Sequence, residues 1–325
     1  MKLSIEKEVK NRGKKDNDTV GATENGKQED KDLLSEFQPN PQFPALSSAV
    51  RIVWGGAGRG RYAVAARDIR VGELVAVERA AVGILDREQA RSHCWHCLTA
   101  TVAPLPCPGC SGVQFCSSAC RTAALSSYHP HECGHTDTLY KAGLGAWHLA
   151  YRLLTATPWQ AVQAGCFTPD PDAGREGVYL SSAPASFASL VTHDGPGGGK
   201  QAPELMMQAH VVVFFLRLLR TTGYLSCDTD SPELSEEELL AGTVLHHLMR
   251  AAYYNTHEIT ELVVTPGGSF RESRPRRIGR VTNPSLALIN HSCDPNYRRV
   301  SNGTTTLGFA CKPISKGKEI SDVYR

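Results

Sequence analysis

The sequence has no long hydrophobic run. Its longest apolar stretch, Val211–Leu216, is closed by Arg217 and Arg220, whereas a helix that crosses a bilayer needs about 20 apolar residues. The first eight residues likewise contain no apolar core of a secretion signal. We therefore expect neither a membrane span nor secretion, but a reducing compartment, the nucleus and/or the cytoplasm. Val211–Leu216 is expected to be a buried helix.

A charge imbalance and internal repeats are missing as well. The formal net charge is only +2, so charge gives no indication of nucleic-acid binding. Residues 1–45 have almost no aromatic side chains and alternate Lys, Glu, Asp, Asn and Gly. Such a segment buries too little surface to offset chain entropy, which predicts a disordered, charged tail. Within it, Lys10–Lys15 could serve as a nuclear localisation signal, although short basic clusters are common in solvated tails.

The sequence does have a dense group of soft metal ligands. Seven of its 11 cysteines and one histidine lie in four evenly spaced pairs between residues 94 and 133. Zinc takes four such ligands in a tetrahedron, so eight predict two closed structural sites with no vertex left for a catalytic water. A disulfide cluster is the alternative, but it requires a secreted protein. The ligands are Cys94, Cys97, Cys107, Cys110, Cys116, Cys120, His129 and Cys133.

Two pairings of these ligands are open. Consecutive pairs could share a zinc, but an interleaved arrangement braces the segment better, because it holds too little apolar bulk for a core of its own. His131 is a rival to His129, which we favour because its spacing from Cys133 puts both side chains on one helical face. Interleaving places Cys94, Cys97, Cys116 and Cys120 on one zinc, and Cys107, Cys110, His129 and Cys133 on the other.

The same segment resembles a known zinc module. Phe115–Arg121, followed by a helix-like stretch to His129, is similar to the MYND-type zinc finger along its whole length. One departure is an additional residue between Cys120 and His129. The resemblance implies a finger that can present a groove for proline-rich peptides.

Short strands and glycine turns precede the finger. Val50–Trp54, Tyr62–Ile69 and Glu73–Val77 show the alternation typical of strands. The turn Gly55–Gly60 between the first two imitates a dinucleotide-binding glycine loop. That loop must open a helix, however, and the residues that follow here continue as a strand.

A helical region follows the finger. Ser235–Glu238 is a capping box, and apolar residues recur after it at helical spacing, so we expect a helix that runs to about Tyr253. His246 and His247 have no acidic or cysteine partner at ligand spacing, and we interpret them as packing residues. The residues expected on one side of the helix are Leu240, Val244, His247, Leu248 and Ala251.

A second motif lies near the C-terminus. Asn290–Asn296 reads Asn-His-Ser-Cys-Asp-Pro-Asn and looks like the signature of the SET-domain lysine methyltransferases. The glycine turn and the closing segment Pro313–Tyr324 match the two ends of that domain. A MYND finger between the first SET strands and the signature is the arrangement of the SET-and-MYND family, which the chain is similar to from about residue 48 onward. Within that family we suspect the arthropod branch.

The resemblance implies an α+β fold class, with a β-rich SET core, an inserted MYND zinc finger and a helical insert. It also implies a protein-lysine N-methyltransferase that uses S-adenosyl-L-methionine and a protein substrate, with two structural zinc ions. The expected segments are the tail at 1–45, the N-terminal part of the SET domain at 46–93, the finger at 94–133, the helical insert at 134–260 and the C-terminal SET core at 261–325.

The family also implies roles for individual residues on the cofactor side. Methyl transfer to a lysine amine is an in-line displacement, so the protein mainly aligns donor and acceptor. Gly58, Arg59 and Gly60 match the loop that approaches the methionine end of the cofactor, where glycine leaves the space that a Cβ would fill. Asn290 matches the side-chain ligand of the cofactor's amino-acid group, and His291 the residue whose backbone contacts the adenine ring.

Further expectations concern the threading and the substrate side. Asn290 and His291 are expected where the chain threads beneath a crossing segment, next to a buried, extended strand at Leu286–Ile289. Asn255 matches a family position near the substrate channel. Tyr324 matches the tyrosine whose hydroxyl orients the target nitrogen by preorganised polarity rather than by taking a proton. A plain core tyrosine is the alternative.

The last residues give two more expectations. Family members continue past this tyrosine into a segment with three cysteines that join the signature cysteine on a third zinc, whereas the sequence given ends at Arg325. Cys293 then lacks those partners, and Cys166, Cys227 and Cys311 have no spacing that replaces them, so we expect no third zinc. This leaves a scaffold with impaired catalysis, which binds partners through its finger, as the alternative to an enzyme.

A basic stretch precedes the signature. It could bind an acidic segment of a substrate or a phosphate backbone, but Pro275 and Gly268 favour a solvated loop. Its members are Arg271, Arg274, Arg276, Arg277 and Arg280.

Overall fold

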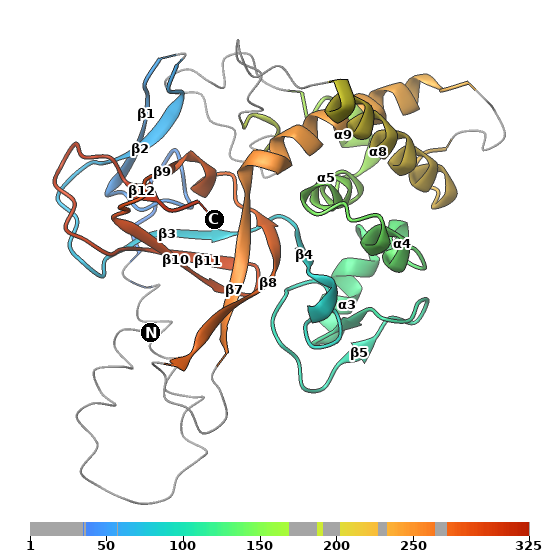
Figure 1. The fold of residues 1–325 in the computed structure, drawn as a ribbon, viewed down its shortest axis with the longest axis horizontal. Coiled ribbons are helices and arrows are strands. Elements are labelled where there is room, and N and C mark those ends of the chain that lie inside the picture. The colour runs from blue at the N-terminus through green and yellow to red at the C-terminus, as the bar shows by residue number, and fades with distance from the viewer. Residues whose placement is uncertain are drawn as a thin grey trace, which may run out of the picture.

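Figure 1 shows a mixed structure in which strands from both ends of the chain lie to one side and helices to the other. A computed structural model of the chain describes residues 35, 37–56, 58–168, 187–190, 202–226, 233–263 and 272–324. The α+β fold class predicted from the sequence is confirmed. The predicted basic cluster Lys10–Lys15, together with Cys227 and Arg271, lies outside the described residues.

Two three-stranded sheets join strands that lie far apart in the sequence. In the first, β3 (Leu74–Arg79) pairs antiparallel with β11 (Thr305–Ala310). In the second, β8 (Arg274–Thr282) lies between β4 (Gly83–Leu85) and β7 (Thr256–Val263). The finger and the helices are therefore an insertion between strands that pair with one another. The first sheet is completed by β10 (Tyr297–Asn302).

Three two-stranded pairs complete the strands. β1 has the predicted bounds, but the predicted strand at residues 62–69 ends at Ala65, because the chain then turns to pair Ile69 with Ile314. The pairs are β1 (Val50–Trp54) with β2 (Arg61–Ala65), β5 (Leu105–Pro106) with β6 (Gln114–Phe115), and, in parallel, β9 (Asn290–His291) with β12 (Ser321–Asp322).

Most of the helices lie between the finger and β7. The helix at the predicted capping box begins as expected: the Ser235 hydroxyl accepts from the Glu238 N–H at 3.3 Å, and the Glu238 carboxylate accepts from the Ser235 N–H at 2.9 Å. The α-helices are α3 (Ser118–Leu125), α4 (Thr136–Lys141), α5 (Ala146–Thr155), α6 (Trp159–Gln163), α8 (Ala202–Thr221) and α9 (Glu236–Asn255). The 3-10 helices are η1 (Arg87–Gln89), η2 (His129–His131) and η4 (Leu286–Leu288).

The burial of α8 and α9 differs from the prediction. Val211–Leu216 is helical, but Val213 is 47% exposed and only Phe215 and Leu216 are buried, because one side of α8 faces solvent. On α9, Leu240 of the predicted apolar side is exposed. The apolar residues of α9 that are buried are Ala241, Leu245, Leu248, Met249, Ala251 and Ala252.

The segment expected as an extended strand before the signature is a 3-10 helix. Leu286, Leu288 and Ile289 are buried, as expected for a core segment, but only Ile289 is extended. The buried carboxylate of Glu78 accepts the N–H groups of Ser285 and Leu286, each at 3.0 Å. The first N–H groups of a helix have no hydrogen-bond partner within the helix. Because the Glu78 carboxylate accepts two such N–H groups in succession, it favours a helical turn here over a strand.

The arginine-rich stretch is a strand and not the predicted loop. Arg274, Arg276, Arg277 and Arg280 belong to β8, and pairing across the sheet stabilises them there. Arg276 forms an ion pair with Glu261 of β7, and Arg277 pairs with Asp86 at 2.7 Å and with Glu258 at 3.0 Å. These carboxylates offset the positive charge of the arginines, so an arginine-rich segment can form a strand of the sheet.

The packed part of the chain begins before residue 46. Phe43 is 6% exposed and Leu46 is fully buried, and Pro39 forms a β-bridge with Ser47. Residues 37–45 of the predicted tail therefore belong to the fold. Residues 1–34 and 36 lie outside the described residues.

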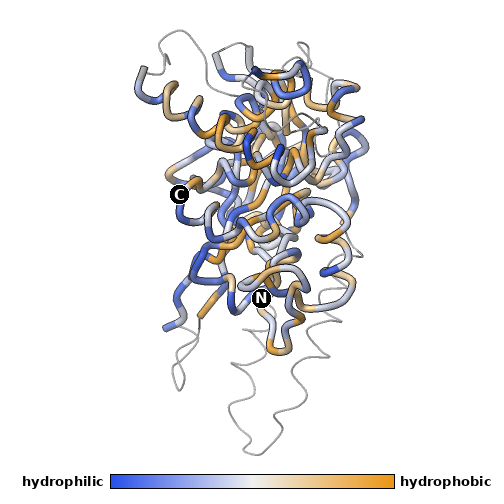
Figure 2. Tube along the Cα trace, turned by 90° about the vertical axis from the view of Figure 1, so that its right-hand side faces the viewer, coloured by the Kyte–Doolittle hydropathy of each residue, from blue (hydrophilic) through white to orange (hydrophobic). Residues whose placement is uncertain are grey.

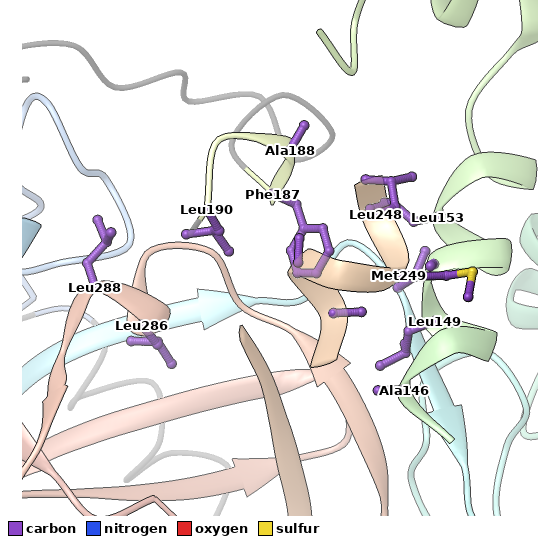
Figure 3. Close-up of a cluster of buried hydrophobic side chains, with 14 of the residues drawn as sticks. Ala146, Leu149, Leu153, Phe187, Ala188, Leu190, Leu248, Met249, Leu286 and Leu288 are labelled. Atoms are coloured by element: carbon purple, nitrogen blue, oxygen red, sulfur yellow. The ribbon is translucent and has the colours of Figure 1, made fainter. Parts of the chain in front are cut away.

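Two hydrophobic clusters hold the elements together. In the larger one, Phe187 and Leu190 pack between α5, α9 and η4 (Figure 3). In the smaller one, Trp95 and Phe115 of the finger pack with Ile278 of β8, so the finger shares a core with the second sheet. Figure 2 shows only short hydrophobic stretches along the tube. Among the described residues, no helix has the length and hydropathy of a membrane span.

Candidate active site and metal centres

Four cysteines from two separate parts of the finger form the first candidate metal centre. Cys94 and Cys97 lie in a turn in which Leu98 has a φ of 63°. Cys116 follows β6, and Cys120 lies on α3, where the Ser117 hydroxyl accepts its N–H. The Cys116 sulfur is 3.6 Å from the Cys97 sulfur and 3.6 Å from the Cys120 sulfur. Four thiolates about 2.3 Å from a zinc ion are separated by about 3.8 Å, so these residues fit zinc.

The second candidate centre has three cysteines and one histidine. The His129 Nε2 atom is 3.2 Å from the Cys107 sulfur and 3.6 Å from the Cys110 sulfur. The Cys133 sulfur is 4.0 Å from that of Cys107. In each centre the four donor atoms lie within 4.8 Å of one another. The structure thus brings together the two interleaved sets predicted from the sequence.

His131, the rival ligand, belongs to neither centre. Its ring packs edge-on against Tyr224, with 5.0 Å between the ring centroids. His129 and Cys133 approach because the Cys133 N–H donates to the His129 carbonyl at 2.7 Å, which closes a helical turn after η2. The helix expected to reach His129 is shorter than predicted, since α3 ends at Leu125.

The glycine turn joins β1 and β2. It is closed by hydrogen bonds from the Gly55 N–H to the Gly60 carbonyl and from the Gly60 N–H to the Gly56 carbonyl, each 2.8 Å long. Gly56 and Gly60 have φ values of 85° and 70°, which a side chain would strain. Gly58 has no such φ, and a Cβ built on it would meet no atom within 4 Å. Open space at Gly58 is compatible with a ligand that approaches its backbone.

A carboxylate that the sequence reasoning missed links this turn to the signature. Glu319 forms an ion pair with Arg59 of the turn and accepts a hydrogen bond from the Asn290 amide at 3.0 Å. The Arg59 guanidinium also lies over the Tyr62 ring, 3.9 Å from its centroid. Three predicted cofactor residues, Gly58, Arg59 and Asn290, are thereby brought to one place, although they come from opposite ends of the chain.

The last segment of the chain holds this arrangement. The Ala65 N–H donates to the Lys318 carbonyl at 2.8 Å, while Ser321 and Asp322 pair in parallel with Asn290 and His291. The segment therefore lies between β2 and β9. Asn296, the last residue of the signature, bridges it by donating to the Glu319 carbonyl at 2.8 Å and accepting the Ser321 N–H at 2.9 Å.

Tyr324 lies beside the signature. Its hydroxyl donates to the Ile289 carbonyl at 2.8 Å, and its N–H donates to Nδ1 of His291 at 2.9 Å. Its side chain is not in the core, since the residue is 52% exposed. Burial of the hydroxyl raises the pKa of Tyr324, and the nearby Asp322 carboxylate adds to the effect. The hydroxyl therefore keeps its proton near neutral pH and acts as a donor.

Tyr324 also lines a cleft of about 420 Å³. The cleft lies between the end of α9, the start of β7, β10 and the last residues of the chain, so Asn255 and Tyr324 share it. The Asn255 amide donates to the Ala251 carbonyl at 2.8 Å and ends α9 at the cleft wall. The structure thus separates the predicted residues into two groups, the predicted cofactor residues around Glu319 and the predicted substrate residue Asn255 at the cleft, with Tyr324 next to both.

Charged groups line the cleft. Arg299 and Asp322 form an ion pair of 2.6 Å. Burial raises the pKa of Asp322, and the charge of Arg299 opposes that shift. His257, also in the lining, is partly buried, and its desolvation, with the charge of Arg299, holds its pKa well below its ordinary value, so its ring is neutral. No sequence pattern marked these three residues, because they meet only through the pairing of β7 with β8 and the placement of β10.

The remaining cysteines and paired histidines are not in a metal centre of the described residues. The Cys293 sulfur is 3.3 Å from Nε2 of His291, and the Cys311 sulfur is 3.5 Å from the Pro295 carbonyl oxygen. His246 contacts the Gln208 side chain at 3.1 Å and His247 the Ala188 carbonyl at 2.6 Å. Cys166 is partly buried beside the larger core.

Comparisons with known proteins agree with this arrangement. The SET domain family model matches residues 60–325. The chain is 26% identical over 358 residues to the protein-lysine N-methyltransferase SMYD4 of Gallus gallus, in a match that covers 89% of this chain and 47% of the relative. It is 28% identical over 89 residues to a SET and MYND domain-containing protein of Dictyostelium discoideum, which covers 27% of this chain and 7% of the relative.

A solved structure is also similar. It is the crystal structure of the SET domain of LSMT bound to lysine and AdoHcy, with a TM-score of 0.35 and 11% identity, over 94% of this chain and 54% of that chain. The chain spans about half the length of the curated SMYD4 relatives that it matches. Because the family match covers most of the sequence, and the eight-ligand finger is inserted ahead of the Asn290–Asn296 signature, the chain belongs to the SET domain family and, within it, to the SET-and-MYND proteins.

Proposed function

We propose that this chain forms the catalytic region of a protein-lysine N-methyltransferase that uses S-adenosylmethionine as methyl donor. Relatives that match most of this chain are named protein-lysine N-methyltransferases. The observation that carries the proposal is the position of Tyr324, between the group that contains Asn290 and the cleft that contains Asn255. A methyltransferase needs a donor site and an acceptor site that meet at one point.

The residues around Glu319 fit a methionine-bearing cofactor. An ammonium and a carboxylate require both acceptors and donors, and the Asn290 amide, the Arg59 guanidinium and the Glu319 carboxylate supply them at one place. Open space at Gly58 lets the backbone approach a ligand. The cofactor would supply an activated methyl group. Glu319 orients the Asn290 amide and fixes the glycine turn through Arg59.

On the other side of Tyr324, the protein has to position a neutral amine. Tyr324 keeps its proton, so its hydroxyl is a hydrogen-bond donor held at the Ile289 carbonyl. Carbonyl and hydroxyl oxygens arranged in advance orient an amine without reorganisation at the moment of reaction. The cleft brings the lysine side chain to this point, with Asn255 in its wall. The zinc ions fold the finger and leave no open coordination position.

Calorimetric titration of S-adenosylmethionine into the purified chain tests the proposal. We expect saturable binding that Asn290→Ala abolishes. Asn302→Ala, at the exposed last residue of β10, is the matched control and should leave binding unchanged. In the same preparations, radioactive methyl groups should appear in lysine after hydrolysis of an acceptor protein mixture. Absence of binding at millimolar cofactor would contradict the proposal.

Two further expectations from the sequence stay predictions. One is the binding of proline-rich peptides by the finger, and the other is a location in the nucleus and/or the cytoplasm. A chain that binds two zinc ions but no cofactor would act as a scaffold. No contact among the described residues favours that function over the enzyme.

A further inference from the structure

The cleft beside Tyr324 carries an excess of positive charge. Three arginines line it, Arg280, Arg298 and Arg299, against two carboxylates, Glu258 and Asp322. The imidazole of His257 in the lining is neutral, because its desolvation and the charge of Arg299 lower its pKa. Such an excess at a substrate site is a recognition feature, since like charges on a partner are repelled and opposite charges attracted.

Both carboxylates are already paired. Asp322 is bound by Arg299 at 2.6 Å. Glu258 lies opposite Arg280 across the β7–β8 pair, 3.7 Å from it, and is held more closely, at 3.0 Å, by Arg277. Neither carboxylate therefore offers a free acceptor to a cationic ligand.

Arg298 remains available. It is exposed on β10, and among the residues that the structure describes no carboxylate forms an ion pair with it. Arg298 lies near Asp322: burial raises the pKa of Asp322, and the charge of Arg298 lowers it by a smaller amount. Arg280 is only loosely held by its distant partner. A guanidinium without a carboxylate partner, on the wall of a cleft, binds a carboxylate through two parallel hydrogen bonds.

We propose that the cleft selects lysines that are flanked by an acidic residue, with Arg298 and Arg280 contacting the acidic side chain. This inference rests on the proposed methyltransferase function, because it names the substrate class of the same site. The residue that enters beside the lysine must be an aspartate or a glutamate, whereas a second lysine or arginine at that place is excluded by the arginines. Arg298 and Arg280 are specificity-determining residues and contact no reacting atom.

Fluorescence anisotropy with labelled peptides tests the inference without catalysis. Three peptides of equal length carry one lysine flanked on both sides by glutamate, by glutamine or by lysine. We expect the glutamate peptide to bind about fivefold more tightly than the glutamine peptide, the size of a partly exposed charge pair. The lysine peptide should bind least tightly. The preference should decrease as ionic strength rises, because the groups are partly exposed.

Two variants assign the preference to the cleft. Arg298→Gln removes one of the two contacting charges, and should reduce the difference in affinity between the glutamate and glutamine peptides. Arg91→Gln removes another exposed arginine, outside the cleft, and should leave the preference intact. Equal affinities in the wild-type chain, or an equal effect of the two variants, would overturn the inference.

Two measurements separate this inference from the function on which it rests. S-adenosylhomocysteine should not displace the glutamate peptide, since the cofactor residues lie around Glu319; displacement would show that the cleft receives the cofactor and would overturn the inference. Methyl transfer to the same peptides is measured in parallel. Selective binding without any methyl transfer would contradict the proposed function but support the acidic preference. Methyl transfer to all three peptides at equal rates would support the proposed function but contradict the acidic preference.

Discussion

Arg152 and Glu132 form a two-point ion pair in the interior of the protein. The Arg152 Nε and Nη2 atoms donate to the two Glu132 carboxylate oxygens at 2.8 and 2.7 Å, and both residues are fully buried. A further Arg152 nitrogen donates to the Gly83 carbonyl of β4, and His148 donates to Glu132 at 2.8 Å. Because Glu132 lies in the finger and Arg152 on α5, this pair connects the finger, the helical region and the SET sheet. Burial would raise the pKa of Glu132, but Arg152 and His148 hold it below its ordinary value.

The first prediction concerns this connection. Arg152→Ala leaves the Glu132 carboxylate buried without its guanidinium partner, and we expect a loss of about 3–5 kcal/mol in the free energy of unfolding. Urea denaturation measures it. Lys141→Ala, which breaks the exposed pair with Asp137 on α4, is the control and should have little effect. Similar losses for the two variants would contradict the role assigned to the buried pair.

The second prediction concerns the start of α9. The hydrogen bond from Arg220, opposed by burial and assisted by the Ser235 N–H, lowers the pKa of Glu238 to about 2. The unfolded value is about 4.3. The folded pKa is the lower one, so the stabilisation is complete above the unfolded value and is lost as pH falls from there toward the folded one.

Urea unfolding of the wild-type chain and of Glu238→Gln checks this dependence. The difference in the free energy of unfolding should be constant near neutral pH and should shrink as the pH falls from about 4 toward about 2. Glu236→Gln changes an exposed residue in the same turn and should give a difference that does not vary with pH. A gap for Glu238→Gln that stays constant over this range would disprove the assigned shift.

The third prediction distinguishes interleaved from consecutive zinc binding. The wild-type chain should contain two zinc ions by elemental analysis. With interleaved centres, replacing Cys97 and Cys116 together by Ser removes one zinc, whereas replacing Cys97 and Cys110 removes both. Consecutive pairing predicts the opposite result for these two double variants. His131→Ala should keep both ions, because its ring packs on Tyr224.

The fourth prediction compares two glycines. A Cβ on Gly279 of β8 would lie 2.0 Å from the Ile84 carbonyl oxygen, so Gly279→Ala should destabilise the fold by about 1–3 kcal/mol. Gly58→Ala meets no atom and needs no unusual φ, so stability should be unchanged. If the backbone at Gly58 approaches the cofactor, the same variant should still weaken S-adenosylmethionine binding. Unfolding and calorimetry on both variants measure these effects, and normal binding by Gly58→Ala would remove this residue from the cofactor site.

The fifth prediction concerns Tyr324. Tyr324→Phe removes the donor to the Ile289 carbonyl but keeps the ring, so we expect kcat to fall about 10²-fold while the cofactor Kd changes little. Tyr253→Phe changes an exposed tyrosine of the same cleft and should leave kcat nearly unchanged. A loss of cofactor affinity that accounts for the whole effect would assign Tyr324 to binding and not to orientation of the amine.

Local patterns predicted the elements whose causes are local. The capping box at Ser235 and Glu238 fixed the start of α9, and the alternation at Val50–Trp54 gave β1 its bounds. The prediction was wrong where a distant group decides the conformation. Glu78 turns Leu286–Leu288 into a 3-10 helix, and the carboxylates of β7 and of Asp86 allow the arginine-rich stretch to be a strand.

The sequence by itself determined which atoms are available to a metal or a cofactor: the eight soft ligands and the signature are set by residue type and spacing, which survive any arrangement of the chain. Only the tertiary structure decided how they combine. The interleaved zinc sets depend on the approach of ligands from separate parts of the finger. The link from Arg59 through Glu319 to Asn290 and the cleft beside Tyr324 depend on β12 pairing with β9 and on the packing of residues remote in the sequence. Such long-range pairing produces no periodic pattern in the sequence. It is stabilised by contacts between residues that are far apart in the chain, and a pattern over a few neighbouring residues cannot reveal such contacts.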